Sequence, residues 1–177
     1  IQKTFHTILE RHEVLRTCYE ERDGVAVQVI GEASDFGLPF TDLTITYDSD
    51  ACREAALMKI EENITLTAFD LEKDFPIRAD LVRISADAHQ LLVCMHHIAG
   101  DGWSERIIKN EIDALYEAYS QGDENPLNPL PLQYADYAHW QRSTLSGDTL
   151  VAQLAYWKQH LDGAPTLLQL PTDRPRP

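Results

Sequence analysis

A run of five apolar residues that ends at two adjacent histidines constrains this sequence more than any other feature. The run occupies residues 91–95, His96 and His97 follow it, and a Gly-Asp-Gly turn occupies residues 100–102. Such a run is typical of a strand buried on both faces, which predicts a central strand. A histidine titrates near neutral pH, so one placed where a strand gives way to a loop can serve as a general base. Neighbouring strand residues point to opposite faces, and we therefore expect one histidine at most to line a given cavity.

The hydrophobic pattern around this run predicts a hairpin and several helices. Residues 77–85 and 90–96 are expected to form antiparallel strands joined by a turn at 86–88. Further strands are expected at 25–30, where valines alternate, and at 43–47. Apolar residues at helical spacing predict helices at residues 1–17, 51–67, 105–121, 133–145 and about 148–162. Strands and helices mixed in this way indicate an α/β layered fold.

The composition excludes several classes of function. The 177-residue chain has a net charge of −14 at pH 7, which argues against nucleic acid and anionic membranes as partners, because both require basic surfaces. No apolar stretch approaches the roughly 20 residues that span a bilayer, and no signal peptide is visible. The three cysteines are far apart in the sequence, which argues against a disulfide framework and predicts a cytoplasmic protein.

Other interpretations of the histidine segment compete with a general base. Both histidines could simply pack at a strand end. His97 and Asp101 could be two ligands of a metal ion, but no zincin spacing exists, because Arg16 stands where a second histidine would be needed. Ser104 lies nearby without the GxSxG context of a nucleophile, and its position predicts that it caps the helix that follows, which Gly122 ends. The sequence therefore predicts no metal.

Two further polar clusters accompany the histidine segment. Residues 11–17 read RHEVLRT, which taken alone is typical of a solvated helix end with ion pairs three residues apart. Residues 134–140 read YADYAHW, a helical segment whose aromatic residues either pack onto a core or form the wall of a cavity. The proline-rich stretch 125–132 separates this segment from the preceding helix and predicts an extended connector.

Taken in order, the three clusters resemble the condensation domain of nonribosomal peptide synthetases. That family carries RHExLRT, MHHxxxDGWS and YxDYAxW blocks, and this chain reads RHEVLRT at 11–17, MHHIAGDGWS at 95–104 and YADYAHW at 134–140. FDL at 69–71 and PLPLQY at 129–134 also look like the family. The resemblance implies an α/β, chloramphenicol-acetyltransferase-like half-domain in which helices cover a mixed sheet.

The resemblance also implies how much of the family domain is present. Residues 1–170 would form the N-terminal subdomain without its first strand and the start of its first helix. Residues 171–177 would form the linker toward a C-terminal subdomain that this chain lacks. The family's active-site tunnel lies between the two halves, so we expect this chain to be inactive alone. An unpaired sheet edge and exposed apolar surface would make it marginally stable or self-associating.

The chemistry that the resemblance implies is amide formation by a condensation-type acyltransferase. An acyl or peptidyl thioester on one carrier protein would react with the amine of an amino acid on the next. His97 matches the family's catalytic histidine, which acts as a general base or positions the amine. Asp101 matches the motif acid, which shapes the loop through an ion pair, and Gly102 would let the backbone approach the reacting centre. Supporting roles are implied for His96, Trp103, Ser104, Arg11 and Arg16.

The resemblance further implies which partners the chain meets. No cofactor is expected on this chain itself, because phosphopantetheine arrives on the carrier proteins. The expected partners are donor and acceptor peptidyl carrier proteins, the C-terminal half and neighbouring synthetase domains. Two alternatives stay open: a non-catalytic half-domain that only docks carrier proteins, and a stand-alone HxxxD acyltransferase that uses coenzyme A thioesters. The paired histidines and the Gly-Trp-Ser order favour ordinary condensation over cyclisation and epimerisation.

Overall fold

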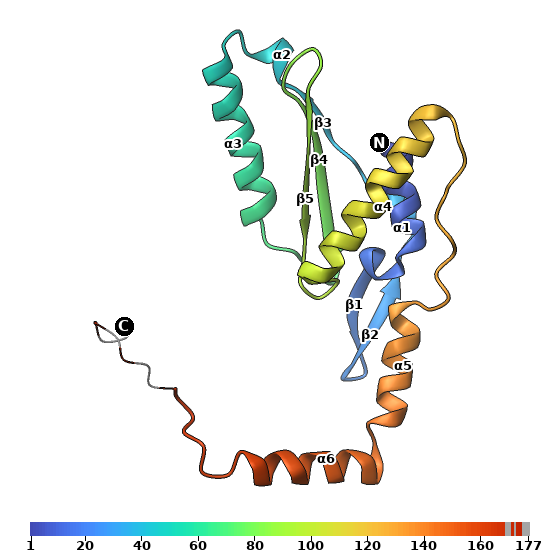
Figure 1. The fold of residues 1–177 in the computed structure, drawn as a ribbon, viewed down its shortest axis with the longest axis vertical. Coiled ribbons are helices and arrows are strands. Elements are labelled where there is room, and N and C mark those ends of the chain that lie inside the picture. Colours follow the sequence, from blue (N-terminus) through green and yellow to red (C-terminus); the bar gives the residue numbers. More distant parts are fainter. Residues whose placement is uncertain (169–170, 172, 175–177) are drawn as a thin grey trace. The chain divides into compact units, whose positions relative to one another are not determined.

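The computed structural model describes residues 1–168, 171, 173 and 174, and the chain divides into two compact units, Ile1–Ala135 and Asp136–Pro177. The expected domain boundary at residue 170 and most of the expected linker at 171–177 lie outside the described residues. The first unit holds both described sheets (Figure 1). Its elements in chain order are α1 (Gln2–Arg11), the 3₁₀ turn η1 (Glu13–Arg16), β1 (Thr17–Arg22), β2 (Val25–Ile30), the 3₁₀ turn η2 (Ala33–Asp35), β3 (Phe40–Asp42), α2 (Leu43–Thr46), α3 (Asp50–Leu66), β4 (Ile77–Arg83), β5 (His89–Met95) and α4 (Gly102–Gln121).

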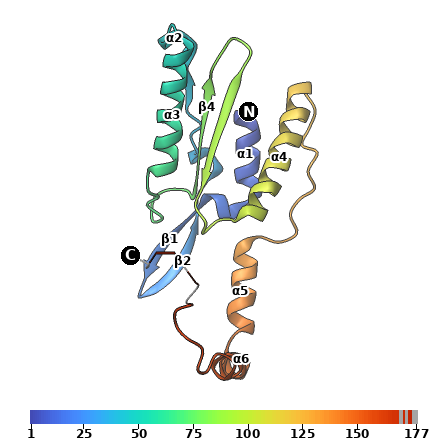
Figure 2. The same ribbon diagram turned by 60° about the vertical axis from the view of Figure 1, so that its left-hand side comes forward.

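The larger described sheet has three strands and mixed pairing, and the family resemblance implies such a mixed sheet. β4 lies in the centre, with β3 parallel to it on one side and β5 antiparallel on the other. α3 covers one face of this sheet, and α1 and α4 lie on the other face (Figures 1 and 2). β5 is an edge strand of the described sheet, and Val93 in its middle is 44% exposed. The expectation of a central strand is therefore wrong: helices lie on both faces of the apolar run, but its side chains are only partly buried, and within the described residues it is paired along one edge only.

Two hydrophobic clusters hold the helices onto the sheet. Phe5, Ile8 and Leu9 of α1 recur at helical spacing and are at most 1% exposed. They form the larger cluster together with Ile112 and Leu115 of α4. Burial of this extent is worth about 1.5–3 kcal/mol for each large side chain. The larger cluster therefore fixes α4, whose first residue follows the histidine loop.

Alternation along β4 distributes its side chains between the two clusters. Ile77 and Ala79 belong to the larger cluster with α1 and α4. Val82 points the other way and packs with Leu43 of α2 and Ala56 of α3. The sheet is therefore packed on both faces, and Met95 and Ala99, at the start of the histidine loop, pack against the larger cluster.

A second sheet consists of the β1–β2 hairpin. Thr17 pairs with Ile30 and Arg22 with Val25, so the turn consists of Asp23 and Gly24 alone. Both turn residues have positive φ, 53° and 75°, which is the backbone that a two-residue hairpin of right-handed twist requires. β2 matches the predicted strand, whereas no strand was predicted where β1 lies, and the helix predicted over 1–17 ends at Arg11.

Several further expectations are tested by the observed elements. The 77–95 hairpin and the helices that correspond to α3, α4, α5 (Tyr134–Thr144) and α6 (Gly147–His160) are confirmed to within a few residues. The expected strand at 43–47 is wrong, because β3 ends at Asp42 and α2 follows. The Asp42 carboxylate accepts a hydrogen bond from the Thr44 N–H and so caps that short helix.

The second unit contains α6 and nearly all of α5. The apolar residues at helical spacing in α6 and at its C-cap are half-exposed: Leu150 at 40%, Leu154 at 47%, Trp157 at 54% and Leu161 at 57%. A unit of two helices has no core that could cover this face. No helix among the described residues is long and apolar enough to cross a membrane.

Candidate functional site

The histidine segment forms a tight loop between β5 and α4. The His96 N–H donates to the Pro76 carbonyl at 2.9 Å and thereby extends the β4–β5 pairing by one bond. The Ala99 N–H then donates to the His96 carbonyl at 2.9 Å, which closes a turn. A Cβ atom added at Gly100 would lie 2.6 Å from the end of Met95 and 2.9 Å from Ser104 Cβ. Glycine is therefore required at this position for close packing.

His97 presents a free ring nitrogen to solvent. Its Nδ1 lies 3.1 Å from the Gly100 carbonyl oxygen. A carbonyl oxygen only accepts hydrogen bonds, so Nδ1 carries the proton in the neutral ring. The other nitrogen, Nε2, then has a lone pair on an exposed side chain. This tautomer is the one that can take a proton from a reacting group at the surface.

His96 has the opposite tautomer and a different environment. Its Nδ1 accepts a hydrogen bond from the Ile98 N–H at 3.0 Å, which places the proton of the neutral ring on Nε2. The ring is half-buried and meets the Phe69 ring edge to face, at 5.7 Å between centroids. The two histidines therefore differ through their loop contacts: the His96 ring is held in the loop, and the His97 ring keeps one nitrogen exposed.

Asp101 caps α4 from the position before its first residue. Its Oδ1 accepts from the backbone N–H groups of Trp103 at 3.1 Å and Ser104 at 3.0 Å, and from the Ser104 hydroxyl at 2.9 Å. The expectation that Ser104 is the cap is therefore wrong, because the helix begins three residues earlier than predicted, at Gly102. Among the described residues no cation lies within ion-pair distance of Asp101, so here the carboxylate shapes the loop by capping.

The cap has two consequences for chemistry. The Ser104 N–H, followed by the Ser104 hydroxyl, holds the pKa of Asp101 below its ordinary value. The capped form is therefore present above the ordinary carboxyl pKa and is lost as pH falls through the lowered value. The amides of Trp103 and Ser104 are occupied by this carboxylate and are not free to bind a reacting oxygen.

The surroundings of the loop are open on the side of Gly102. A Cβ atom at this position would meet no heavy atom within 4 Å. Trp103 is 68% exposed, and the Arg106 guanidinium lies 4.5 Å above its ring. The backbone at Gly102 is therefore uncovered on this side, and its expected approach to a reacting centre stays a prediction. Within the described residues there is no group of three or more side chains that could hold a metal ion.

The two glycines of this loop should respond differently to alanine. Gly100→Ala is expected to lower the free energy of unfolding of the 177-residue chain by about 1–3 kcal/mol, because Ser104 must shift. Gly102→Ala is expected to leave it unchanged or raise it by about 0.5 kcal/mol, because alanine has less backbone freedom to lose. Urea unfolding followed by tryptophan fluorescence measures both. Equal losses in the two variants would contradict the packing explanation.

The RHEVLRT block is tied into the fold and is not a solvated helix end as expected from its pattern. Arg11 Nε donates to Glu111 Oε1 of α4 at 3.0 Å, and His12 Nε2 lies 2.6 Å from Glu111 Oε2. All three side chains are only 13–16% exposed. Gln133 joins them, since its amide donates to the Arg11 carbonyl at 2.8 Å and its oxygen accepts from the Glu13 N–H at 3.2 Å. Neither Glu111 nor Gln133 was singled out from the sequence pattern as a partner of this block. An acid within an otherwise apolar helical stripe was the available signal for Glu111.

Arg16 binds the backbone of two neighbouring elements. Its Nε donates to the Leu9 carbonyl at 2.9 Å, and its Nη1 donates to the Gly31 carbonyl. It also lies 3.8 Å from Glu13, which is the expected ion pair three residues apart. Arg11 and Arg16 therefore have structural contacts, and the structure does not bring either into hydrogen-bond contact with His97 within the described residues.

Comparison with known proteins identifies the family. The family described as "Condensation domain" matches residues 1–177, and this chain belongs to it. One of the polypeptides of linear gramicidin synthase from Brevibacillus parabrevis is 46% identical over 176 residues, which are 99% of this chain and 3% of that protein. Malpibaldin synthetase of Mortierella alpina is 41% identical over 177 residues, which are 99% of this chain and 3% of that protein.

Solved structures confirm the fold class. The X-domain in its complex with OxyB from teicoplanin biosynthesis superposes with a TM-score of 0.82 at 31% identity, over 99% of this chain and 38% of that one. The starter condensation domain of rhizomide synthetase RzmA gives a TM-score of 0.81 at 17% identity, over 93% of this chain and 39% of that one, which supports the fold alone. The fold is the predicted chloramphenicol-acetyltransferase-like arrangement, and the chain spans less than half of each of these domains.

Proposed function

We propose that this chain is the N-terminal half of a condensation domain that forms amide bonds in a nonribosomal peptide synthetase. One observation carries the proposal: His97 donates from Nδ1 to the Gly100 carbonyl and keeps Nε2 free at an exposed turn. Membership of the condensation-domain family and the synthase names of the relatives support it. We propose further that the protein works in the cytoplasm, on substrates that donor and acceptor carrier proteins deliver as phosphopantetheine thioesters.

A thioester is already activated for attack by an amine. The protein therefore has to orient the two substrates and provide one proton acceptor. The amine of the acceptor attacks the thioester carbonyl, and a C–N bond forms. His97 Nε2 takes the proton that the attacking nitrogen loses. The C–S bond then breaks, and the protonated ring returns the proton to the leaving sulfur. Asp101 holds the start of α4 in place through its bonds to Trp103 and Ser104, so that the loop keeps its shape during this exchange.

Amide formation by the full-length protein tests the proposal. Donor and acceptor carriers are loaded, and the product is identified by mass spectrometry. We expect an amide from the full-length protein and none from the 177-residue chain, whose tunnel would lack its second wall. Product from the isolated chain would overturn the two-half tunnel. Product from coenzyme A thioesters at equal rate would favour the stand-alone acyltransferase, and carrier binding without any product would favour a docking half-domain.

A further inference from the structure

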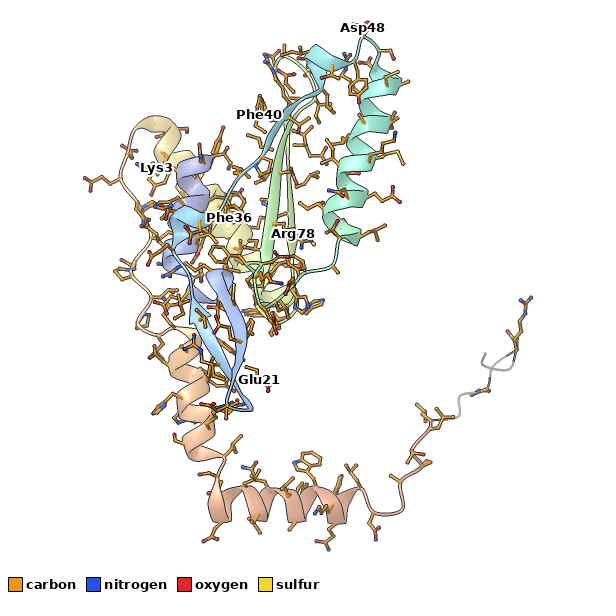
Figure 3. The ribbon with its side chains drawn as sticks, turned by 180° about the vertical axis from the view of Figure 1, so that it is seen from behind. Lys3, Glu21, Phe36, Phe40, Asp48 and Arg78 are labelled. Atoms are coloured by element: carbon orange, nitrogen blue, oxygen red, sulfur yellow. The ribbon has the colours of Figure 1, made fainter. Side chains whose placement is uncertain are left out.

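The half-buried histidine of the loop is the last member of a stack that starts on β4. Phe69 lies in the loop between α3 and β4, and its ring contacts two partners. The Arg78 guanidinium lies 3.9 Å from the ring centroid, and the His96 ring meets it at 5.7 Å and 82°. Arg78 is labelled on its strand in Figure 3. A cation on a ring face and a second ring at an edge-to-face angle are both favourable arrangements.

Three hydrogen bonds hold the Arg78 guanidinium in place against the Phe69 ring. Its Nη1 donates to the Thr67 carbonyl at 2.6 Å, and its Nη2 donates to the Ala68 carbonyl at 2.7 Å and to Asp74 Oδ2 at 2.9 Å. The two carbonyls belong to the residues directly before Phe69. One guanidinium therefore fixes both the backbone that carries the aromatic ring and the face of the ring. The planar fork of arginine makes these bonds together, which a lysine ammonium cannot reproduce.

At the other end of the stack, His96 is hydrogen-bonded to two residues of the histidine loop. The His96 ring accepts the Ile98 N–H, and the His96 carbonyl accepts the Ala99 N–H, so its orientation sets the turn that follows. That turn places the Gly100 carbonyl 3.1 Å from His97 Nδ1. If the His96 ring rotates away, the Ile98 N–H loses its acceptor and the turn loosens. The carbonyl that fixes the His97 tautomer then moves as well.

From this geometry we propose that Phe69 and Arg78 are positioning residues for His97, acting through His96. The proposal rests on the proposed function of His97 in amide formation. Neither residue touches the exposed ring itself in the contacts described. Their effect is to hold the Nδ1–H tautomer of His97 and the position of its Nε2 before substrates arrive, which is how a rigid supporting shell sharpens a site.

The neighbouring strand β5 provides a matched control. His89, the first residue of β5, stacks on Phe40, the first residue of β3, at 6.3 Å between centroids and 30° between planes. This pair has the same chemistry, but Phe40 is 56% exposed and its partner lies at the opposite end of β5 from the loop. Phe40→Leu therefore removes an aromatic–histidine contact without touching the histidine loop.

The test compares Phe69→Leu, Phe69→Tyr and Phe40→Leu in the full-length protein. Hydrogen exchange of the peptide that covers residues 96–102 measures the loop, and steady-state amide formation gives kcat and KM. We expect Phe69→Leu to speed exchange in this peptide about tenfold and to lower kcat about tenfold, with KM for both carriers within about twofold. Phe69→Tyr keeps the aromatic ring, so its exchange rate and kcat should be close to those of the wild type. Phe40→Leu should change neither the exchange rate nor kcat.

Each outcome decides the proposal. Wild-type exchange and kcat in Phe69→Leu, or equal effects of Phe69→Leu and Phe40→Leu, would overturn it. If exchange also rises throughout α1 and β4, Phe69→Leu is unfolding the protein. Arg78→Lys then replaces it, and the same two measurements are made. We expect faster hydrogen exchange in residues 96–102 and a lower kcat for Arg78→Lys, and wild-type values would overturn the proposal. If the wild type forms no amide, the proposed function fails, while the exchange data still show whether Phe69 holds the loop.

Discussion

Replacing His97 with alanine is expected to lower the rate of amide formation about 10²–10⁴-fold in the full-length protein, which is the usual contribution of a general base. The variant removes the Nε2 lone pair that the bond from Nδ1 to the Gly100 carbonyl leaves free. Single-turnover mass spectrometry with preloaded carriers measures the chemical step separately from carrier exchange. Amide formation at the wild-type rate would remove His97 from the reaction.

Two further variants show what His97 contributes. His97→Asn keeps an N–H that can donate to the Gly100 carbonyl but has no basic nitrogen. Activity as low as that of His97→Ala would assign proton transfer to the ring, whereas activity near wild type would assign only positioning of the amine. His89→Ala removes an exposed histidine from the start of β5, the strand that leads into the histidine loop. This variant should leave the rate of amide formation unchanged. A loss with His89→Ala would mean that strand damage explains the effect.

The site was predictable where it rests on local sequence. The histidine loop, its position after a strand and the helix that follows can be inferred from residues 77–122, because alternation, apolar spacing and Gly122 are local signals. The identity of the cap was not predictable in this way. Asp101 and Ser104 are both good N-cap residues, and only the extended backbone of Asp101, with φ −136° and ψ −175°, shows where the helix begins.

The errors in the fold arise where tertiary contacts override local preference. Residues 43–47 are rich in β-branched side chains, yet the Asp42 cap and burial of Leu43 against Val82 favour a short helix there. β1 is polar along most of its length, and only its pairing with β2 makes it a strand. No role near the site was predicted for Glu111 or for Phe69, because their partners are distant in sequence.

Removing the Glu111 carboxylate is expected to have the largest effect on stability of any polar substitution in the first unit. Glu111→Ala leaves Arg11 and His12 without their shared partner at 13–16% exposure, and breaking such a network costs about 3 kcal/mol or more. Glu111→Gln keeps an oxygen that can accept from Arg11 Nε and should cost less, about 1–2 kcal/mol. Urea unfolding of the 177-residue chain, with the midpoint and slope fitted together, measures the difference.

An exposed ion pair on α4 serves as a control. It distinguishes loss of the half-buried Glu111 network from the loss of any surface charge. Lys109 and Asp113 are 2.6 Å apart at 72% and 62% exposure, so Asp113→Asn should leave the unfolding midpoint unchanged. Raising the salt concentration should likewise weaken the Glu111 network little, because its charges are largely shielded from ions. A loss in Glu111→Ala no larger than that in Asp113→Asn would show that α1 and α4 are held by the apolar cluster alone. A large loss would instead mean that the RHEVLRT block acts as a polar bridge that fixes α4, and with it the helix start that Asp101 caps.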